Sequence, residues 1–105
     1  MLIGITPGRA LRWGPRWLPA EQSLLFDASS GDYWVLGEVT RQLLEGLQQD
    51  GPMRLSEVTA RVGGNEEDGR ELITELSRCG LLVGWVEGKV VGLAAFLDTA
   101  DWSAA

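Results

Sequence analysis

The sequence predicts an α+β domain, and three observations carry this prediction. Two short runs of large apolar residues, 24–26 and 33–36, flank a segment rich in turn-forming residues, as in a β-hairpin. From residue 38 the apolar spacing changes from two residues to three and four, which is typical of an amphipathic helix. Two more stretches with helical spacing follow before the chain returns to short apolar runs. We therefore expect strands first, then three helices, then a final pair of strands.

The N-terminal sheet is expected to contain three antiparallel strands. Residues 11–19 mix large apolar side chains with arginine and two prolines. An outer strand is predicted at the start of this segment, because proline is tolerated at sheet edges. That strand would pair with the hairpin. We expect Trp13 and Trp17 to cover one end of the sheet, with contact to a partner as the alternative.

The second strand of the hairpin is apolar on both faces. Tyr33 and Val35 share one face, and Trp34 and Leu36 share the other. Alternation alone does not decide which pair turns inward. A strand of this kind is either covered on both sides or waits for a partner to cover it.

Three helices are predicted after the hairpin. The first spans 38–49 and ends at the glycine and proline of 51–52, which form a stop signal. A second, shorter helix follows Leu55. The third covers 66–79, and its acidic first turn suits the positive end of the helix dipole. Cys79 is expected to be a small buried apolar residue.

Residues 85–91 have the pattern of a small hairpin, which after a third helix would form a wing. Strands, three helices and a C-terminal wing are the plan of a winged-helix-like domain. We expect this single domain to span 11–97. Residues 1–10 would form a flexible arm outside the core, and residues 98–105 a flexible tail.

The composition argues against an enzyme. The 105 residues are 45% hydrophobic and 23% charged, as in an ordinary globular domain, and they include one cysteine and no histidine. These counts exclude an imidazole base, a Cys–His pair, an internal disulfide and a zinc site with the usual ligands. The carboxylates are spread along helices and turns. We therefore expect no catalytic residue, no metal and no cofactor.

No apolar run approaches the roughly 18 residues that a membrane span requires. We expect a cytoplasmic protein without a membrane partner.

The charge pattern disfavours nucleic acid as a partner. The net charge is −6, and residues 1–20 contain three arginines and no acidic residue, so subtracting their +3 leaves −9 for the rest. The third predicted helix holds five carboxylates against two arginines. A helix that enters the major groove would carry basic and amide side chains instead. A winged-helix DNA-binding regulator is therefore the less favoured alternative.

A set of residues spread over 11–83 resembles a known family, and their order and spacing carry the resemblance. The set is Trp17, Leu25-Phe26-Asp27, Ser30-Gly31-Asp32, Leu36, Leu43-Leu44, Leu47, Gly51-Pro52, Leu55-Ser56-Glu57-Val58, and Leu72 through Leu76 with Cys79-Gly80-Leu81-Leu82. It is similar to the PqqD-like peptide chaperones, also called RiPP recognition elements. The closest likeness is to the PqqD-type members found with HPr-kinase-related proteins.

This resemblance implies a non-catalytic domain that captures a peptide. In the family, the leader segment of a ribosomally made precursor peptide is added beside the third strand and rests against the third helix. A separate modifying enzyme then acts on the peptide. Carried over to this chain, the resemblance implies a peptide-binding site made of Tyr33, Trp34, Val35, Leu36, Leu72, Glu75, Leu76 and Arg78.

Two other uses of the same strand remain open from the sequence. An unpaired edge strand can pair with a second copy, which would give a homodimer. The edge could equally bind a folded protein, in which case the chain would be an adaptor. A folded partner, unlike a leader peptide, should not be replaceable by a short linear fragment of itself.

Overall fold

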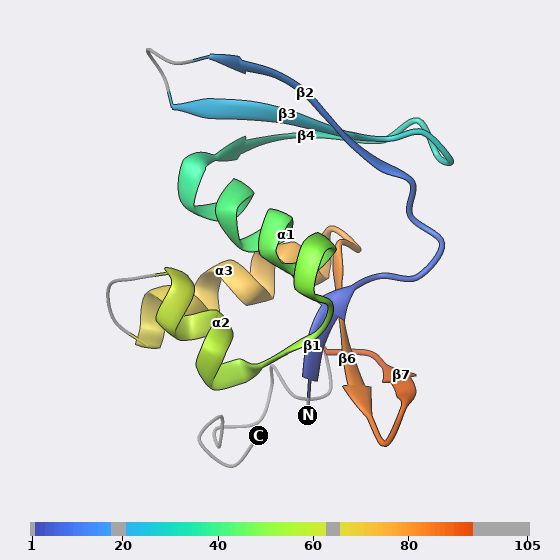
Figure 1. Ribbon diagram of the computed structural model, residues 1–105, viewed down its shortest axis with the longest axis vertical. Helices are drawn as coiled ribbons and strands as arrows, with labels where there is room; N and C mark the ends of the chain where they lie inside the picture. The colour runs from blue at the N-terminus through green and yellow to red at the C-terminus, as the bar shows by residue number, and fades with distance from the viewer. Residues whose placement is uncertain (1, 18–20, 63–65, 94–105) are drawn as a thin grey trace.

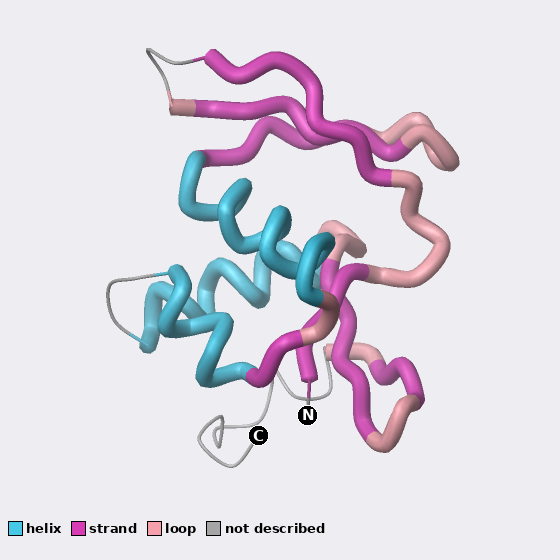
Figure 2. The backbone as a smooth tube through the Cα atoms, in the orientation of Figure 1, coloured by secondary structure: helices cyan, strands magenta, loops and turns pink. Residues whose placement is uncertain are grey.

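The computed structural model describes residues 2–17, 21–62 and 66–93, which form an α+β fold (Figures 1 and 2). Three helices and seven strands lie in these ranges. In chain order they are β1 (Leu2–Ile5), β2 (Leu11–Trp17), β3 (Gln22–Asp27), β4 (Tyr33–Gly37), α1 (Glu38–Asp50), β5 (Met53–Arg54), α2 (Leu55–Val62), α3 (Glu66–Arg78), β6 (Leu82–Val86) and β7 (Lys89–Val91).

The described strands form two antiparallel sheets instead of the single N-terminal sheet and separate wing that the sequence predicts. The predicted three-stranded sheet exists, in the order β2-β3-β4. A second sheet has four strands, in the order β5-β1-β6-β7. The C-terminal hairpin is formed by β6 and β7 as expected, but β6 also pairs with β1 along its other side. The hairpin is therefore part of a larger sheet.

The N-terminal segment differs from the expected flexible arm of residues 1–10. Residues Leu2–Ile5 form β1, a central strand that pairs with β5 and with β6. The Ile3 side chain is 0% exposed and belongs to the main hydrophobic core. Local patterning did not reveal this strand, because four residues show little alternation and both of its partners lie far along the chain.

Helix α1 lies between the two sheets and supplies much of the core. In Figure 1 the three-stranded sheet is the top layer, α1 lies directly beneath it, and no described element covers the outer side of that sheet. Leu25 of β3 is 0% exposed, and it packs in the same core as Leu43 and Leu44 of α1. Burial of these side chains holds the small sheet against the helix.

The helices follow the predicted pattern, with one correction at the end of α3. Helix α1 ends at Asp50, and Gly51 takes a φ of 82°, a left-handed conformation that glycine adopts without a steric penalty. Cys79 is exposed, not buried as expected. It directly follows the last residue of α3, where the chain turns at Gly80.

None of the helices in the described part of the chain is long and apolar enough to cross a membrane. The expected tail at 98–105 lies outside the described residues.

Candidate binding edge on the three-stranded sheet

The two sheets have four outer strands, and three of these carry features that discourage pairing with another chain. Strand β5 has two residues, and β7 has three, including Lys89. Strand β2 contains Pro15, and its register with β3 shifts between Trp13 and Arg16. Short length, lysine, proline and irregular register are the usual means of protecting an edge. Strand β4 has none of them: its five residues, YWVLG, are uncharged and pair with β3 in regular register.

The pairing of β4 with β3 determines which backbone groups face outward. Asp27 N–H donates a 2.8 Å hydrogen bond to the Asp32 carbonyl, so these two residues form a hydrogen-bonded pair at the turn. Hydrogen-bonded and non-bonded pairs alternate along an antiparallel ladder. Trp34 therefore directs its N–H and C=O towards β3, and Tyr33 and Val35 direct theirs to the open edge. No described strand pairs with β4 on that side.

The side chains of β4 divide between two environments. Trp34 and Leu36 point inward, are half-buried and pack against the hydrophobic core. Tyr33 and Val35 point outward and are 70% and 51% exposed. The ambiguity that the sequence left about the two faces is thus decided in favour of Trp34 and Leu36 as the inner pair.

The outer face continues the apolar surface from β4 onto β3. Phe26 lies directly across from Tyr33 in the register, and Leu24 lies across from Val35. Phe26 is 38% exposed. These four side chains, which we call the outer apolar face, therefore adjoin the unpaired backbone groups of β4.

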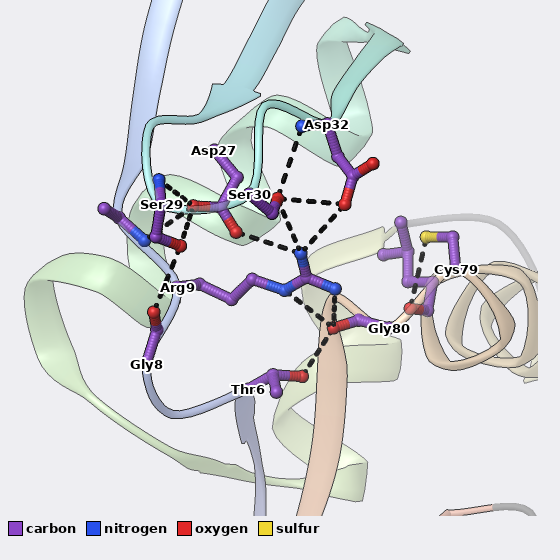
Figure 3. A network of polar contacts seen from close by, with 11 residues as sticks. Thr6, Gly8, Arg9, Asp27, Ser29, Ser30, Asp32, Cys79 and Gly80 are labelled. Atoms are coloured by element: carbon purple, nitrogen blue, oxygen red, sulfur yellow. Dashed lines mark hydrogen bonds and ion pairs between the residues drawn. The ribbon is translucent and has the colours of Figure 1, made fainter.

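A polar network beneath the hairpin turn joins β4 to the end of α3 (Figure 3). The Arg9 guanidinium donates to Asp27 Oδ2 at 2.9 Å. It also donates two hydrogen bonds, of 3.2 and 3.3 Å, to the Gly80 carbonyl that follows α3. The Arg9 Cζ atom lies 5.4 Å from the centre of the Trp34 ring, within cation–π range. Arg9 thereby holds the C-terminal end of α3 beside the inner face of β4.

Asp27 is the buried centre of this network, with 0% of its surface exposed. Its Oδ1 accepts hydrogen bonds from the Ser29 hydroxyl at 2.5 Å, from the Ser29 N–H at 2.8 Å and from the Ala10 N–H at 3.1 Å. The Ser29 hydroxyl and then Arg9 hold the pKa of the Asp27 carboxyl well below its usual range, although burial acts in the opposite direction. The carboxylate is thus ionised, and it fixes the turn that precedes β4.

A second arginine contacts the same inner face of the sheet near its other edge, at β2 and β3, and holds it on α1. Arg41 Cζ lies 4.7 Å from the centre of the Trp13 ring, and Arg41 Nη1 donates a 3.0 Å hydrogen bond to Ser23 Oγ. The indole N–H of Trp13 donates to Gln48 Oε1 at 2.9 Å. One arginine–tryptophan pair therefore anchors β2 and β3 to α1, and the other anchors the turn and β4 to the end of α3.

The predicted wall on α3 is only partly available at the surface. Leu76 is 3% exposed and belongs to the core, and Leu72 is half-buried against it. Glu75 and Arg78 are exposed. Of these, Arg78 is the last residue of α3, two positions before the Gly80 carbonyl that Arg9 binds. The structure thus brings the end of α3, rather than its middle, to the inner side of β4.

Sequence reasoning did not single out Arg9 or Phe26 as site residues. Phe26 could have been found, because alternation across the hairpin places it on one face with Tyr33 once the register is known. No local signal identified Arg9, since its partners Asp27 and Gly80 lie 18 and 71 positions away.

The four-stranded sheet carries an apolar hollow of about 500 Å³, lined by Leu2, Pro52, Trp85, Val86, Glu87 and Gly88. Its lining offers one carboxylate, Glu87, and no hydroxyl, thiol, imidazole or amine side chain beside it. Over the described ranges, no three side chains of His, Cys, Asp or Glu gather in an arrangement that could hold a metal ion. The edge of β4 is accordingly the candidate site with the most definite geometry.

The chain was compared with protein-family models, with curated proteins and with solved structures, and none of them matches it.

Proposed function

We propose that this chain is a non-catalytic, winged-helix-like module that captures an extended peptide at the edge of β4. In the form that the family resemblance suggests, the peptide is the leader segment of a ribosomally made precursor. The module presents it in the cytoplasm to a separate modifying enzyme. Adding a strand satisfies backbone donors and acceptors of both partners, and side-chain contacts on either face then select the guest.

The observation that carries this proposal is the difference between β4 and the other outer strands. Only β4, among the outer strands of the described sheets, combines five residues, a regular register and no charged or proline residue. An exposed apolar edge is a risk of aggregation unless a partner uses it. Two exposed apolar side chains, Tyr33 and Val35, belong to the residues whose backbone groups face outward.

The charge on α3 supports a peptide over DNA. Four carboxylates lie on the exposed part of this helix, which a regulator would insert into the major groove. They are Glu67, Asp68, Glu71 and Glu75. Such a helix would be repelled by a phosphate backbone.

Two proline variants test the use of the edge. Val35→Pro removes a donor that faces the open edge, so we expect the variant to remain folded, at a stability cost of about 1 kcal/mol, and to lose peptide capture. Trp34→Pro removes a half-buried ring and also a backbone donor that faces β3, so it should lower the free energy of unfolding by about 4 kcal/mol. The measurement is a pull-down from host lysate with immobilised protein, with retained peptides identified by mass spectrometry and folding checked by circular dichroism.

A short peptide that the parent retains, that Val35→Pro loses and that binds again as a synthetic copy would support the proposal. Retention of the same peptide by folded Val35→Pro would refute strand addition. A retained protein that no linear fragment of itself replaces would favour the adaptor function.

A further inference from the structure

The kinds of side chain that a guest peptide needs at this edge can be specified, on the condition that the proposed function is correct. We infer that the site takes an extended cationic segment with two apolar side chains two residues apart, flanked by lysine or arginine. The apolar pair would extend the outer apolar face by one strand.

The apolar requirement follows from which residues of β4 direct their backbone groups to the open edge. A guest strand can hydrogen-bond to β4 only through residues whose backbone groups face the edge. These include Tyr33 and Val35, the first and third residues of the strand. Side chains of directly paired residues lie on the same face of a sheet. The guest residues beside Tyr33 and Val35 therefore project onto the outer face, where the rows Phe26–Tyr33 and Leu24–Val35 end.

Each row is extended by one apolar side chain when the guest is apolar at both positions; the first row already runs from Arg12 through Phe26 to Tyr33. Phe26, Tyr33 and Val35 are 38%, 70% and 51% exposed, so a good part of each side chain remains to be covered. Aromatic and β-branched cross-strand pairs contribute roughly 0.2–1 kcal/mol each, in addition to the gain from the apolar area that they bury. A polar guest residue at either position would lose this contribution.

The charge requirement follows from the acidic balance of the whole chain, which carries −6. Asp32 immediately precedes β4, and its side chain is 62% exposed and forms a 3.5 Å ion pair with Arg9. Arg12 lies across from Phe26 on the outer face and adds a positive charge there, so the attraction for a basic peptide comes from the net charge of the chain. Two copies of this chain would repel each other, whereas a peptide with flanking lysine or arginine would be attracted. We therefore assign the edge to a cationic peptide and not to a second copy.

A peptide-display selection tests the inference while the natural ligand is still unidentified. The probe is a library of random linear 12-residue peptides, selected at low salt against the immobilised full chain. We expect enrichment of Val, Ile, Leu, Phe, Tyr or Trp at positions i and i+2, with lysine or arginine outside them. The most enriched peptide is then synthesised and its affinity measured by fluorescence polarisation.

A matched pair of variants localises the binding surface. Val35→Ser should lower the affinity for the selected peptide by about tenfold, which corresponds to the loss of one buried aliphatic contact. Val90→Ser is the control, because Val90 is also on an outer strand and is 45% exposed against 51% for Val35. It should leave the affinity unchanged. A second form of the selected peptide, with glutamate in place of its flanking lysine or arginine, should bind more weakly than the original at 20 mM salt. This difference in affinity should shrink at 500 mM salt.

The outcomes separate this inference from the proposed function. Enriched peptides that depend on Val35 but lack the i, i+2 apolar pattern or the basic flanks would overturn the inference and leave peptide capture intact. If no peptide is enriched, both fail. If gel filtration shows a dimer that Val35→Pro converts to a monomer, a second copy occupies the edge and the inference is wrong.

Discussion

Strands β4 and β7 are both outer strands, yet they expose their backbones in different ways. Strand β4 presents five uncharged residues, whereas β7 has three and begins with Lys89. Apolar exposure alone does not separate them, because Val35 and Val90 are 51% and 45% exposed. The difference teaches that the two edges differ in length and charge, not in the presence of an exposed valine, and we expect these two properties to decide which edge accepts a strand.

The largest expected loss of stability comes from substitutions in the core. These substitutions test whether the two sheets, with their different edges, share one core. Ile3 lies in the central strand β1 and Leu25 in the central strand β3, and both are 0% exposed in the same cluster. Ile3→Ala and Leu25→Ala should each lower the free energy of unfolding by about 3 kcal/mol. Urea titrations followed by circular dichroism should give one transition in each case.

Leu24→Ala is the control for this pair, since Leu24 is only half-buried on the outer face. It should cost about 1 kcal/mol. Two separate transitions in Leu25→Ala would mean that the small sheet unfolds independently of the rest.

A smaller, pH-dependent effect should come from Asp27, the buried carboxylate below the β3–β4 turn. Its pKa is lowered in the folded protein by Ser29 and Arg9, so the unfolded chain takes up a proton first as the pH falls. The stabilisation from Asp27 is therefore complete above the ordinary aspartate pKa of about 3.9, and it is lost as the pH falls below that value. Asp27→Asn should be less stable than the parent at pH 7, and the difference should narrow below about pH 4.

The measurement is the urea midpoint of both proteins between pH 7 and pH 2.5. Asp50→Asn serves as the control, because the Asp50 carboxylate is 59% exposed and lies 3.7 Å from the exposed Arg61. Removing such an exposed pair should change stability by less than about 1 kcal/mol. A difference between parent and Asp27→Asn that stays constant down to pH 2.5 would contradict this role of the carboxylate.

The smallest changes in stability should come from exchanging valine and lysine between the edges of β4 and β7. The same two variants should differ most clearly in peptide binding. Val35→Lys gives β4 the protective residue of β7, and we expect loss of peptide capture with a stability change within about 1 kcal/mol. Lys89→Val removes that residue from β7. Because β7 has only three residues, we expect no second capture site. Binding of the selected peptide and light scattering check both variants, and gain of peptide binding by Lys89→Val would show that charge alone protects β7.

Local patterns were sufficient to predict the elements whose partners lie nearby in sequence. The hairpin, the three helices and the C-terminal hairpin all form within short segments, and the switch in apolar period at residue 38 marks the start of α1. Tyr33, Trp34, Val35 and Leu36 were placed on one strand for the same reason, whereas their assignment to a binding site came from the family resemblance. Their inward or outward direction required the position of α1, which no local pattern contains.

Features that join distant segments were not predictable in this way. Strand β1 has four residues and gains its stability from β5 and β6, so its sequence shows no clear period. Arg9 is one arginine in a segment without periodicity, and its role depends on a carbonyl at Gly80. Leu76 was assigned to the α3 wall by resemblance, and its position in the core depends on how α3 rotates about its own axis against the sheets.

The pairing of β1 with β6 has a consequence for the order of folding during synthesis. Strand β1 precedes every other described element in the chain, but its partner spans Leu82–Val86. The strands of the small sheet and α1, in contrast, all lie within the first 50 residues, and the pairing of β2, β3 and β4 is local in sequence. Because domains assemble from the contacts that are available as the chain emerges, we expect β1 to remain unpaired with β6 until nearly all the described chain has been translated. We therefore expect the pairing of β2, β3 and β4 to form earlier than the contacts, such as Arg9 with the Gly80 carbonyl, that hold this sheet beside α3.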